Sequence, residues 1–292
     1  MENYILMIDS DSDLSFDLQE KLQIPVVYMP YIINGQEFFA SLGKGGTLPE
    51  FYNKMRSGEV PVTASLSTPD YIDYFEPVLK SGKDILFIAF SSQLSSTIQN
   101  IYEAKNHLLS IYTERRFEVV DTLSISFPET LLILKAHELY TNGASMDEIV
   151  AWLEENKLKA QVYLTVDNLV YFKRGGRISG TAAFMGTLLD LKPLITLSKE
   201  GKLVPIEKIK GRKKALRAII NHLKENITDA DQQQVIVFHA DCENEANSVI
   251  AMLQKELPET KDIRVDIVGE VIGAHCGPGT IGIAFMGKER PY

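Results

Sequence analysis

Hydroxyl side chains crowd one short segment of this sequence. Residues 91–97 read Ser-Ser-Gln-Leu-Ser-Ser-Thr, directly after an apolar run of strand length and before an amphipathic helical stretch. The first backbone N–H groups of a helix have no partners within the helix, and the helix dipole is positive at that end. We therefore expect an anion such as a carboxylate or a phosphate to bind here. Helix capping alone would need only Ser95 or Ser96.

A second segment rich in hydroxyls lies earlier in the chain. Residues 63–69 read Thr-Ala-Ser-Leu-Ser-Thr-Pro, and Thr68 with Pro69 has the order of a helix N-cap and a first-turn proline. Taken alone, this segment is weak evidence for a ligand site, because the helix cap already explains Thr68. Because loops at the carboxyl ends of strands lie close together in α/β sheets, it could also face residues 91–97 from a neighbouring loop.

Carboxylates that follow the first apolar strand indicate an alternative, enzymatic function. Residues 9–13 read Asp-Ser-Asp-Ser-Asp. A haloacid-dehalogenase-like phosphohydrolase would use Asp9 as the nucleophile, Asp11 as the general acid and Ser91 to bind phosphate. Such an enzyme needs further carboxylates to hold magnesium, and only Asp167 follows a suitable strand. The run does not fit a calcium loop, because Leu14 stands where the turn needs glycine.

Other catalytic and metal-binding patterns are missing or misplaced. Residues 277–282 match the dinucleotide fingerprint by letter, but they lead into a strand instead of a helix. The four possible zinc ligands are His239, Cys242, His275 and Cys276, which lack zinc-finger spacing. No Gly-x-Ser-x-Gly or P-loop lysine motif occurs. We expect no metal and no cofactor, and His275 is either structural or a ligand-binding side chain.

Basic side chains form two local groups on an acidic chain. The formal net charge of -9 opposes general attraction to nucleic acid or anionic lipid. Lys173, Arg174 and Arg177 nevertheless surround two glycines, and residues 208–217 are rich in Lys and Arg with no acidic residue. These groups predict a docking surface, although a solvated helix face would explain residues 208–217 equally well.

Apolar runs of strand length alternate with amphipathic helical segments, which is typical of α/β folds. We predict strands at 4–8, 84–90, 117–120, 161–166, 235–240, 263–269 and 281–286, and helices at 98–109, 146–157, 212–226 and 243–257. Capping-box spacing marks two helix starts, at Thr47 and at Ser145. Asn34 and Gly35 tolerate positive φ and predict a hairpin between the runs 28–33 and 36–40.

Length and composition predict two domains in a reducing compartment. A chain of 292 residues is about twice the size of one typical core, and the pattern changes near residue 158. Only two cysteines occur, the first residues show no export signal, and no apolar run approaches the roughly 20 residues that span a bilayer. We expect a soluble, cytoplasmic protein.

Together, short motifs spread over nearly the whole chain resemble the DegV family of bacterial fatty-acid-binding proteins. In chain order they are Asp9-Ser10, Ala64-Ser65, Ser91-Ser92-x-Leu94-Ser95-x-Thr97, Asp121-Thr122, Lys173-x-Gly175-Gly176-Arg177-Ile178-Ser179, Lys192-Pro193 and His275-x-Gly277-Pro278-Gly279. Each motif is short, but their order and spacing along one chain are specific.

The resemblance implies two α/β domains with a ligand cleft between them. Residues 1–158 would hold the tail of a long-chain fatty acid, and residues 159–292 would close over its carboxylate. The protein would be a carrier without catalytic residues, and a separate ATP-binding fatty acid kinase subunit would phosphorylate the carboxylate. Arg177 and Lys210 match basic positions of the family and would serve docking to this partner or transient contact with a membrane. No nucleic acid is expected, and the phosphohydrolase remains the alternative.

The resemblance also assigns the carboxylate contacts, which would fall on Ala64, Ser65, Ser95 and His275. The family usually has Thr-Ser at positions 64 and 65, so Ala64 removes one side-chain donor. Thr63, Ser65 or backbone N–H groups would replace it. Pro128 and Glu129 stand where the family has a glycine-rich stretch, which bears on the preference for the tail.

Overall fold

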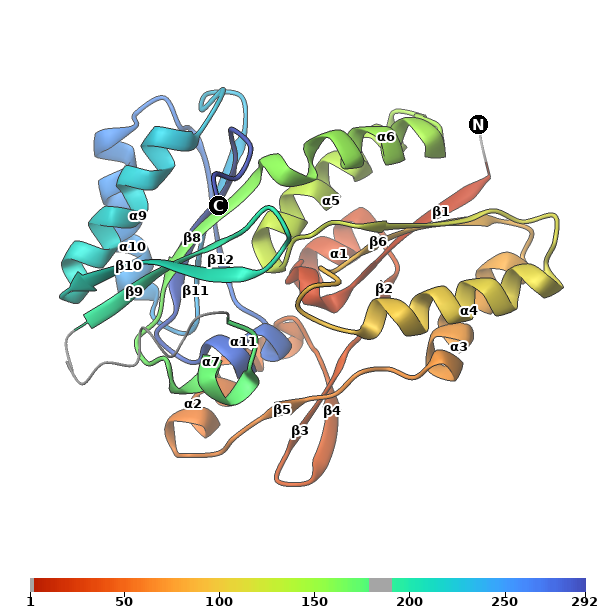
Figure 1. The fold of residues 1–292 in the computed structure, drawn as a ribbon, viewed down its shortest axis with the longest axis horizontal. Helices are drawn as coiled ribbons and strands as arrows, with labels where there is room; N and C mark the ends of the chain where they lie inside the picture. Colours follow the sequence, from red (N-terminus) through yellow and green to blue (C-terminus); the bar gives the residue numbers. More distant parts are fainter. Residues whose placement is uncertain (1–2, 179–190) are drawn as a thin grey trace.

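The computed structural model describes residues 3–178 and 191–292 and shows a mixed α/β architecture with three sheets (Figure 1). The predicted α/β class is confirmed. Ser179, the last residue of one motif above, lies outside the described residues. Within the described part of the chain, none of the helices has both the length and the apolar composition that crossing a bilayer requires.

The first sheet has four parallel strands in the order β2-β1-β6-β7. Its strands are β1 (Tyr4–Asp9), β2 (Val26–Val27), β6 (Asp84–Ala89) and β7 (Phe117–Asp121), and its helices are η1 (Ser10–Ser12), α1 (Phe16–Leu22), α3 (Thr68–Lys80), α4 (Thr97–Ile111), α5 (Ser126–Thr141) and α6 (Met146–Asn156). Met7 and Phe87 belong to the apolar cluster of α3 and α4. Ile8 and Ile88 belong to that of α5 and α6. Helices on both faces explain why these strands are continuous apolar runs.

The second sheet has six strands in the order β10-β9-β8-β13-β11-β12. They are β8 (Ala160–Thr165), β9 (Leu191–Leu197), β10 (Leu203–Lys210), β11 (Gln234–His239), β12 (Asp262–Ile267) and β13 (Ile281–Met286), and α9 (Arg212–Asn226) and α10 (Glu243–Glu256) cover one face. Tyr163 and Val237 face these two helices. Leu164 and Phe238 lie on the opposite face and belong to the apolar cluster of α3 and α4. The second sheet therefore packs toward the first half of the chain.

A small third sheet, β4-β3-β5, lies beside several short helices (Figure 1). Its strands are β3 (Pro30–Ile33), β4 (Gln36–Phe39) and β5 (Val62–Thr63), and the helices are η2 (Lys44–Gly46), α2 (Leu48–Arg56), α7 (Val170–Gly175) and α11 (Glu270–Cys276). Asn34 and Gly35 have φ of 52° and 78°, so the predicted hairpin is confirmed. The predicted strand at 263–269 is too long, because β12 ends at Ile267 and α11 follows.

Helix starts agree only partly with the predicted caps. At Ser145 the capping box is present, since its hydroxyl accepts a hydrogen bond from Glu148 N–H and the Glu148 carboxylate accepts one from Ser145 N–H. Thr47 has helical dihedral angles and makes no side-chain cap, so that prediction is wrong. The cap of α3 is Ser67, which makes Thr68 the first helical residue.

One buried arginine connects several chain segments by hydrogen bonds near the predicted domain boundary at residue 158. Arg290 is 1% exposed. It donates to the carbonyls of Ala160 (2.9 Å), Leu123 (2.7 Å), Ser198 (3.2 Å) and Lys157 (3.2 Å), and to Ser124 Oγ (2.6 Å). These acceptors lie in the loop after β7, in η3 (Lys157–Lys159) and β8, and at the turn between β9 and β10. The division at residue 158 stays a prediction, because one apolar cluster includes side chains of both large sheets.

Candidate functional site

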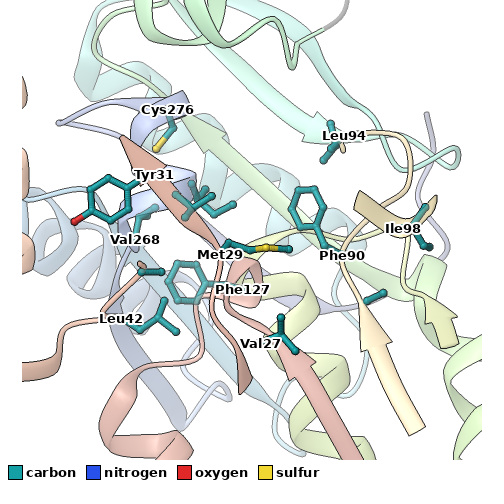
Figure 2. Packing of buried hydrophobic residues seen from close by; sticks show 14 of the residues in the cluster. Val27, Met29, Tyr31, Leu42, Phe90, Leu94, Ile98, Phe127, Val268 and Cys276 are labelled. Carbon is teal, nitrogen blue, oxygen red and sulfur yellow. The ribbon is translucent and has the colours of Figure 1, made fainter. Parts of the chain in front are cut away.

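A narrow, largely apolar cavity lies where the three sheets meet. Its empty space, counted with the open solvent at its mouth, is about 930 Å³. The walls are formed by Asp11, Met29, Thr63, Ala64, Ser65, Phe90, Leu94, Ser95, Thr97, Ile125, Ser126, Pro128, Val162, Leu164, Phe172, Arg177, Leu203, Phe238, Val268, Val271, Ile272, His275, Cys276 and Thr280. Figure 2 shows how Met29, Phe90 and Val268 pack in this region. The cavity brings together five of the six predicted site residues.

His275 is a neutral imidazole held at the wall of the cavity. It lies in the last turn of α11, and its Nε2 is 3.0 Å from Thr63 Oγ1. Burial, and then the nearby positive charge of Arg177, lower the pKa of His275 to about 4. A neutral imidazole has one N–H donor, so His275 can donate a hydrogen bond to an anion but does not neutralise its charge.

Ser95 lies beside the start of α4, and within residues 3–178 and 191–292 its hydroxyl accepts hydrogen bonds without donating one. Its Oγ accepts hydrogen bonds from Thr97 Oγ1 (2.9 Å) and Thr97 N–H (3.3 Å). Ser96, the residue at the N-cap position, makes no side-chain cap. The Ser95 hydroxyl can therefore donate to an anion in the cavity, next to the positive end of the α4 dipole.

Thr63 supplies a hydroxyl close to the one that Ala64 lacks. Ala64 and Ser65 both line the cavity directly after β5, and Ser65 is exposed. Thr63 contacts His275 and lines the same wall. Of the replacements expected for the missing donor, the geometry favours Thr63 over Ser65.

The two predicted docking residues have different places. Arg177 is exposed at the cavity, and its guanidinium donates to the carbonyls of Leu94 (3.3 Å) and Gly175 (2.6 Å). A shallow groove continues outward from it and is lined by Ser92, Gln93, Leu94, Ser95, Ser96, Gly176, Arg177 and Lys202. Lys210 is exposed at the end of β10 and does not line the cavity. Docking by either residue stays a prediction.

Asp9 is poorly placed to act as a phosphohydrolase nucleophile. It is 1% exposed and does not line the cavity. Its two carboxylate oxygens accept hydrogen bonds from Asp11 N–H and Phe90 N–H, both at 3.0 Å. Burial raises the pKa of Asp9 to about 7, and the Ser91 hydroxyl donates to Gly201 O at 2.8 Å. Both side chains are therefore bonded within the protein, and the geometry does not support the hydrolase alternative.

The described residues offer no obvious metal site. No group of three or more His, Cys, Asp or Glu side chains among residues 3–178 and 191–292 is arranged to hold a metal ion. His239 Nδ1 instead accepts a hydrogen bond from Cys242 N–H at 3.2 Å.

Gly175 makes room for the His275 ring, which gives a test of this geometry. A Cβ at position 175 would lie 2.1 Å from His275 Nδ1. Gly175→Ala should therefore displace the imidazole from Thr63 toward solvent. By NMR titration we expect the pKa of His275 to rise from about 4 toward the ordinary value of 6.5. Gly176→Ala controls for backbone strain alone, since residue 176 has a φ of 66° but its Cβ would meet nothing within 4 Å; an unchanged His275 in Gly175→Ala would contradict the geometry.

Known proteins match this chain almost over its full length. The family described as uncharacterised protein, DegV family, matches residues 4–288. A DegV domain-containing protein of Clostridium perfringens is 36% identical, with 99% of each chain covered.

Solved structures agree with this family. A DegV family protein of Thermus thermophilus, described by its fatty acid binding, is 31% identical with a TM-score of 0.85, covering 97% of this chain and 99% of its own. A DegV lipid-binding protein of Thermotoga maritima is 28% identical with a TM-score of 0.86, covering 99% of this chain and all of its own. From the family match and the identity to the Clostridium protein, this chain belongs to the DegV family.

Proposed function

We propose that this chain is a non-catalytic carrier that binds one long-chain fatty acid. The alkyl tail would occupy the apolar cavity, and the carboxylate would lie near Ser95, Thr63 and His275. One observation supports the proposal most strongly: the hydroxyl and imidazole donors line the same narrow apolar cavity, beside the exposed Arg177. The fatty acid binding described for the Thermus relative supports it.

The apolar walls account for most of the expected affinity. Burial of each methylene contributes about 0.8 kcal/mol, so the tail of a long-chain fatty acid supplies on the order of 10 kcal/mol before the costs of ordering. The uncharged His275 and the Ser95 hydroxyl then orient the carboxylate without neutralising it. Such a site binds fatty acids tightly and leaves the carboxylate chemically available.

The protein should purify with one fatty acid per chain, because an apolar cavity of this kind will fill from cellular lipid. Mass spectrometry after denaturing extraction measures the stoichiometry. Val162→Phe, which places a larger ring in the cavity wall, should lower it, whereas Val265→Phe on the exposed side of β12 should not. A wild-type protein without stoichiometric acyl chain would refute the carrier. Activity on a phosphate ester with magnesium, lost in Asp9→Asn, would favour the hydrolase.

We further propose that the bound carboxylate is presented to an ATP-binding fatty acid kinase subunit in the cytoplasm. The exposed Arg177 and the groove with Lys202 lie next to the expected carboxylate position and offer positive charge to an acidic partner surface. Both cysteines are free thiols, which suits a reducing compartment.

Charge reversal tests the docking residues. Arg177→Glu and Lys210→Glu should slow phosphorylation of the bound fatty acid by a fatty acid kinase subunit, measured as acyl phosphate formed. The control Lys255→Glu on α10 should not. Fatty acid affinity, measured in parallel, should be unchanged in Lys210→Glu. Normal phosphorylation in both variants, together with weaker binding to anionic vesicles, would assign these residues to membrane contact instead.

A further inference from the structure

The cavity has a second polar wall, remote from His275. Asp11 and Ser126 line it. Ser126 donates a hydrogen bond to Asp13, whose other oxygen accepts one from Gly269 N–H at 3.0 Å, at the start of α11. His275 lies in the last turn of the same helix. Six residues at 1.5 Å each separate Gly269 from His275, so the two ends of α11 lie roughly 9 Å apart along its axis.

Asp11 is the unusual member of this wall. It is 6% exposed, and its Oδ1 is shielded from solvent without a hydrogen-bond partner among the described residues. The neighbouring Asp9 carboxylate accepts hydrogen bonds from Asp11 N–H and Phe90 N–H, and neither bond involves the Asp11 side chain. Glu129, fully buried at the start of α5, has two more carboxyl oxygens without partners. Buried polar atoms of this kind are rare in native proteins, because each unmade hydrogen bond costs free energy.

The protonation of Asp11 determines which ligand group suits it. Burial, and then the negative charges of Asp9 and Asp13, hold the pKa of Asp11 well above its ordinary value. This shift favours the protonated carboxyl of Asp11, which has one O–H donor and one carbonyl acceptor. A hydroxyl group both donates and accepts, so it can pair with each of them, whereas a methylene can pair with neither.

We propose that this chain selects long-chain fatty acids whose alkyl tail carries a hydroxyl that hydrogen-bonds to Asp11. The proposal rests on the fatty acid carrier function above. Asp11 lines the cavity that the alkyl tail would occupy, so the hydroxyl would lie on the tail. An oxygen there regains the hydrogen bonds that Asp11 lacks, while the carboxylate remains near Ser95.

Competition binding tests the selectivity on delipidated protein. Octadecanoic acid and a series of hydroxyoctadecanoic acids, with the hydroxyl moved along the chain, displace a fluorescent fatty acid. The wild-type protein should bind one hydroxy isomer about tenfold more tightly than octadecanoic acid, and isomers with the hydroxyl moved along the chain in either direction less tightly. In Asp11→Leu, which has a similar shape without polar atoms, the preference should reverse.

The control distinguishes this proposal from the carrier function itself. Ser95→Ala should weaken both kinds of acid by the same factor and leave their ratio unchanged. Equal wild-type affinities along the series, or a preference that persists in Asp11→Leu, would overturn the hydroxyl site while the carrier function stands. If neither acid displaces the probe, both proposals are wrong. Should Asp11→Leu fail to fold, the dependence on hydroxyl position in the wild-type protein alone decides.

Discussion

Ser95→Ala and His275→Ala are each expected to lower the affinity for a long-chain fatty acid by about tenfold to a hundredfold. Each removes a hydrogen bond to a charged carboxylate, which is worth roughly 1.5 to 3 kcal/mol. The buried tail should still hold the ligand, so binding is weakened and not abolished. Displacement of a fluorescent fatty acid measures the change.

Ser65→Ala is the matched control, because Ser65 lines the cavity but is exposed to solvent. It should change the affinity less than Ser95→Ala. The double variant of Ser95 and His275 should lose less than the sum of the single losses if both groups touch one carboxylate. Wild-type affinity in both single variants would show that the carboxylate binds elsewhere.

Arg290→Met should lower the free energy of unfolding by roughly 3 to 5 kcal/mol. The substitution keeps an unbranched, flexible side chain but removes the donor that the guanidinium provides to five oxygens. These oxygens lie where the two large sheets meet. Urea unfolding gives the change directly. Burial lowers the pKa of Arg290 to about 10, so the group remains charged at neutral pH.

Two variants show what the arginine contributes. Arg290→Lys keeps the charge but loses the planar fork, so it should also destabilise, although by less. Arg217→Met removes an arginine that pairs with Glu256 on the surface, with a side chain 51% exposed, and should cost at most about 1 kcal/mol. A loss for Arg290→Met as small as that for Arg217→Met would mean that water replaces the guanidinium at little cost.

Elements with local signals were predictable from the sequence. The helix α9 has the predicted bounds, and the Asn34-Gly35 turn and the Ser145 cap depend on residues close in the chain. The short helix α11 was not predicted, because Gly269 provides no side-chain cap and Glu270–Cys276 has no amphipathic pattern. The pairing of β5 with β3 depends on segments about thirty residues apart, and no local residue type indicates it.

The candidate site was predictable in its residue types more than in its contacts. The hydroxyl clusters indicate a ligand site because polar groups beside strand ends are typical of such sites, whereas the binding role of His275 is implied by the family resemblance. The bond between Thr63 and His275, and the space that Gly175 leaves for the ring, depend on tertiary packing and could not be read from spacing. From the sequence, Asp11 is a candidate general acid of a phosphohydrolase. The role that we propose for it depends on its burial and its unpartnered oxygen, which spacing does not indicate.

The place of β13 in the second sheet has a consequence for biosynthesis. β13 is the last strand of that sheet to be synthesised, yet it lies between β8 and β11 and joins β10-β9-β8 to β11-β12. At 5–20 residues per second, on the order of ten seconds pass on the ribosome between β8 and β13. During that interval β8 and β11 expose unpaired backbone N–H and C=O groups, which can pair with other nascent chains. The strands β10-β9-β8 and β11-β12 therefore cannot form one sheet until β13 is available. The growing polypeptide should be most prone to aggregate just before β13 emerges from the ribosome.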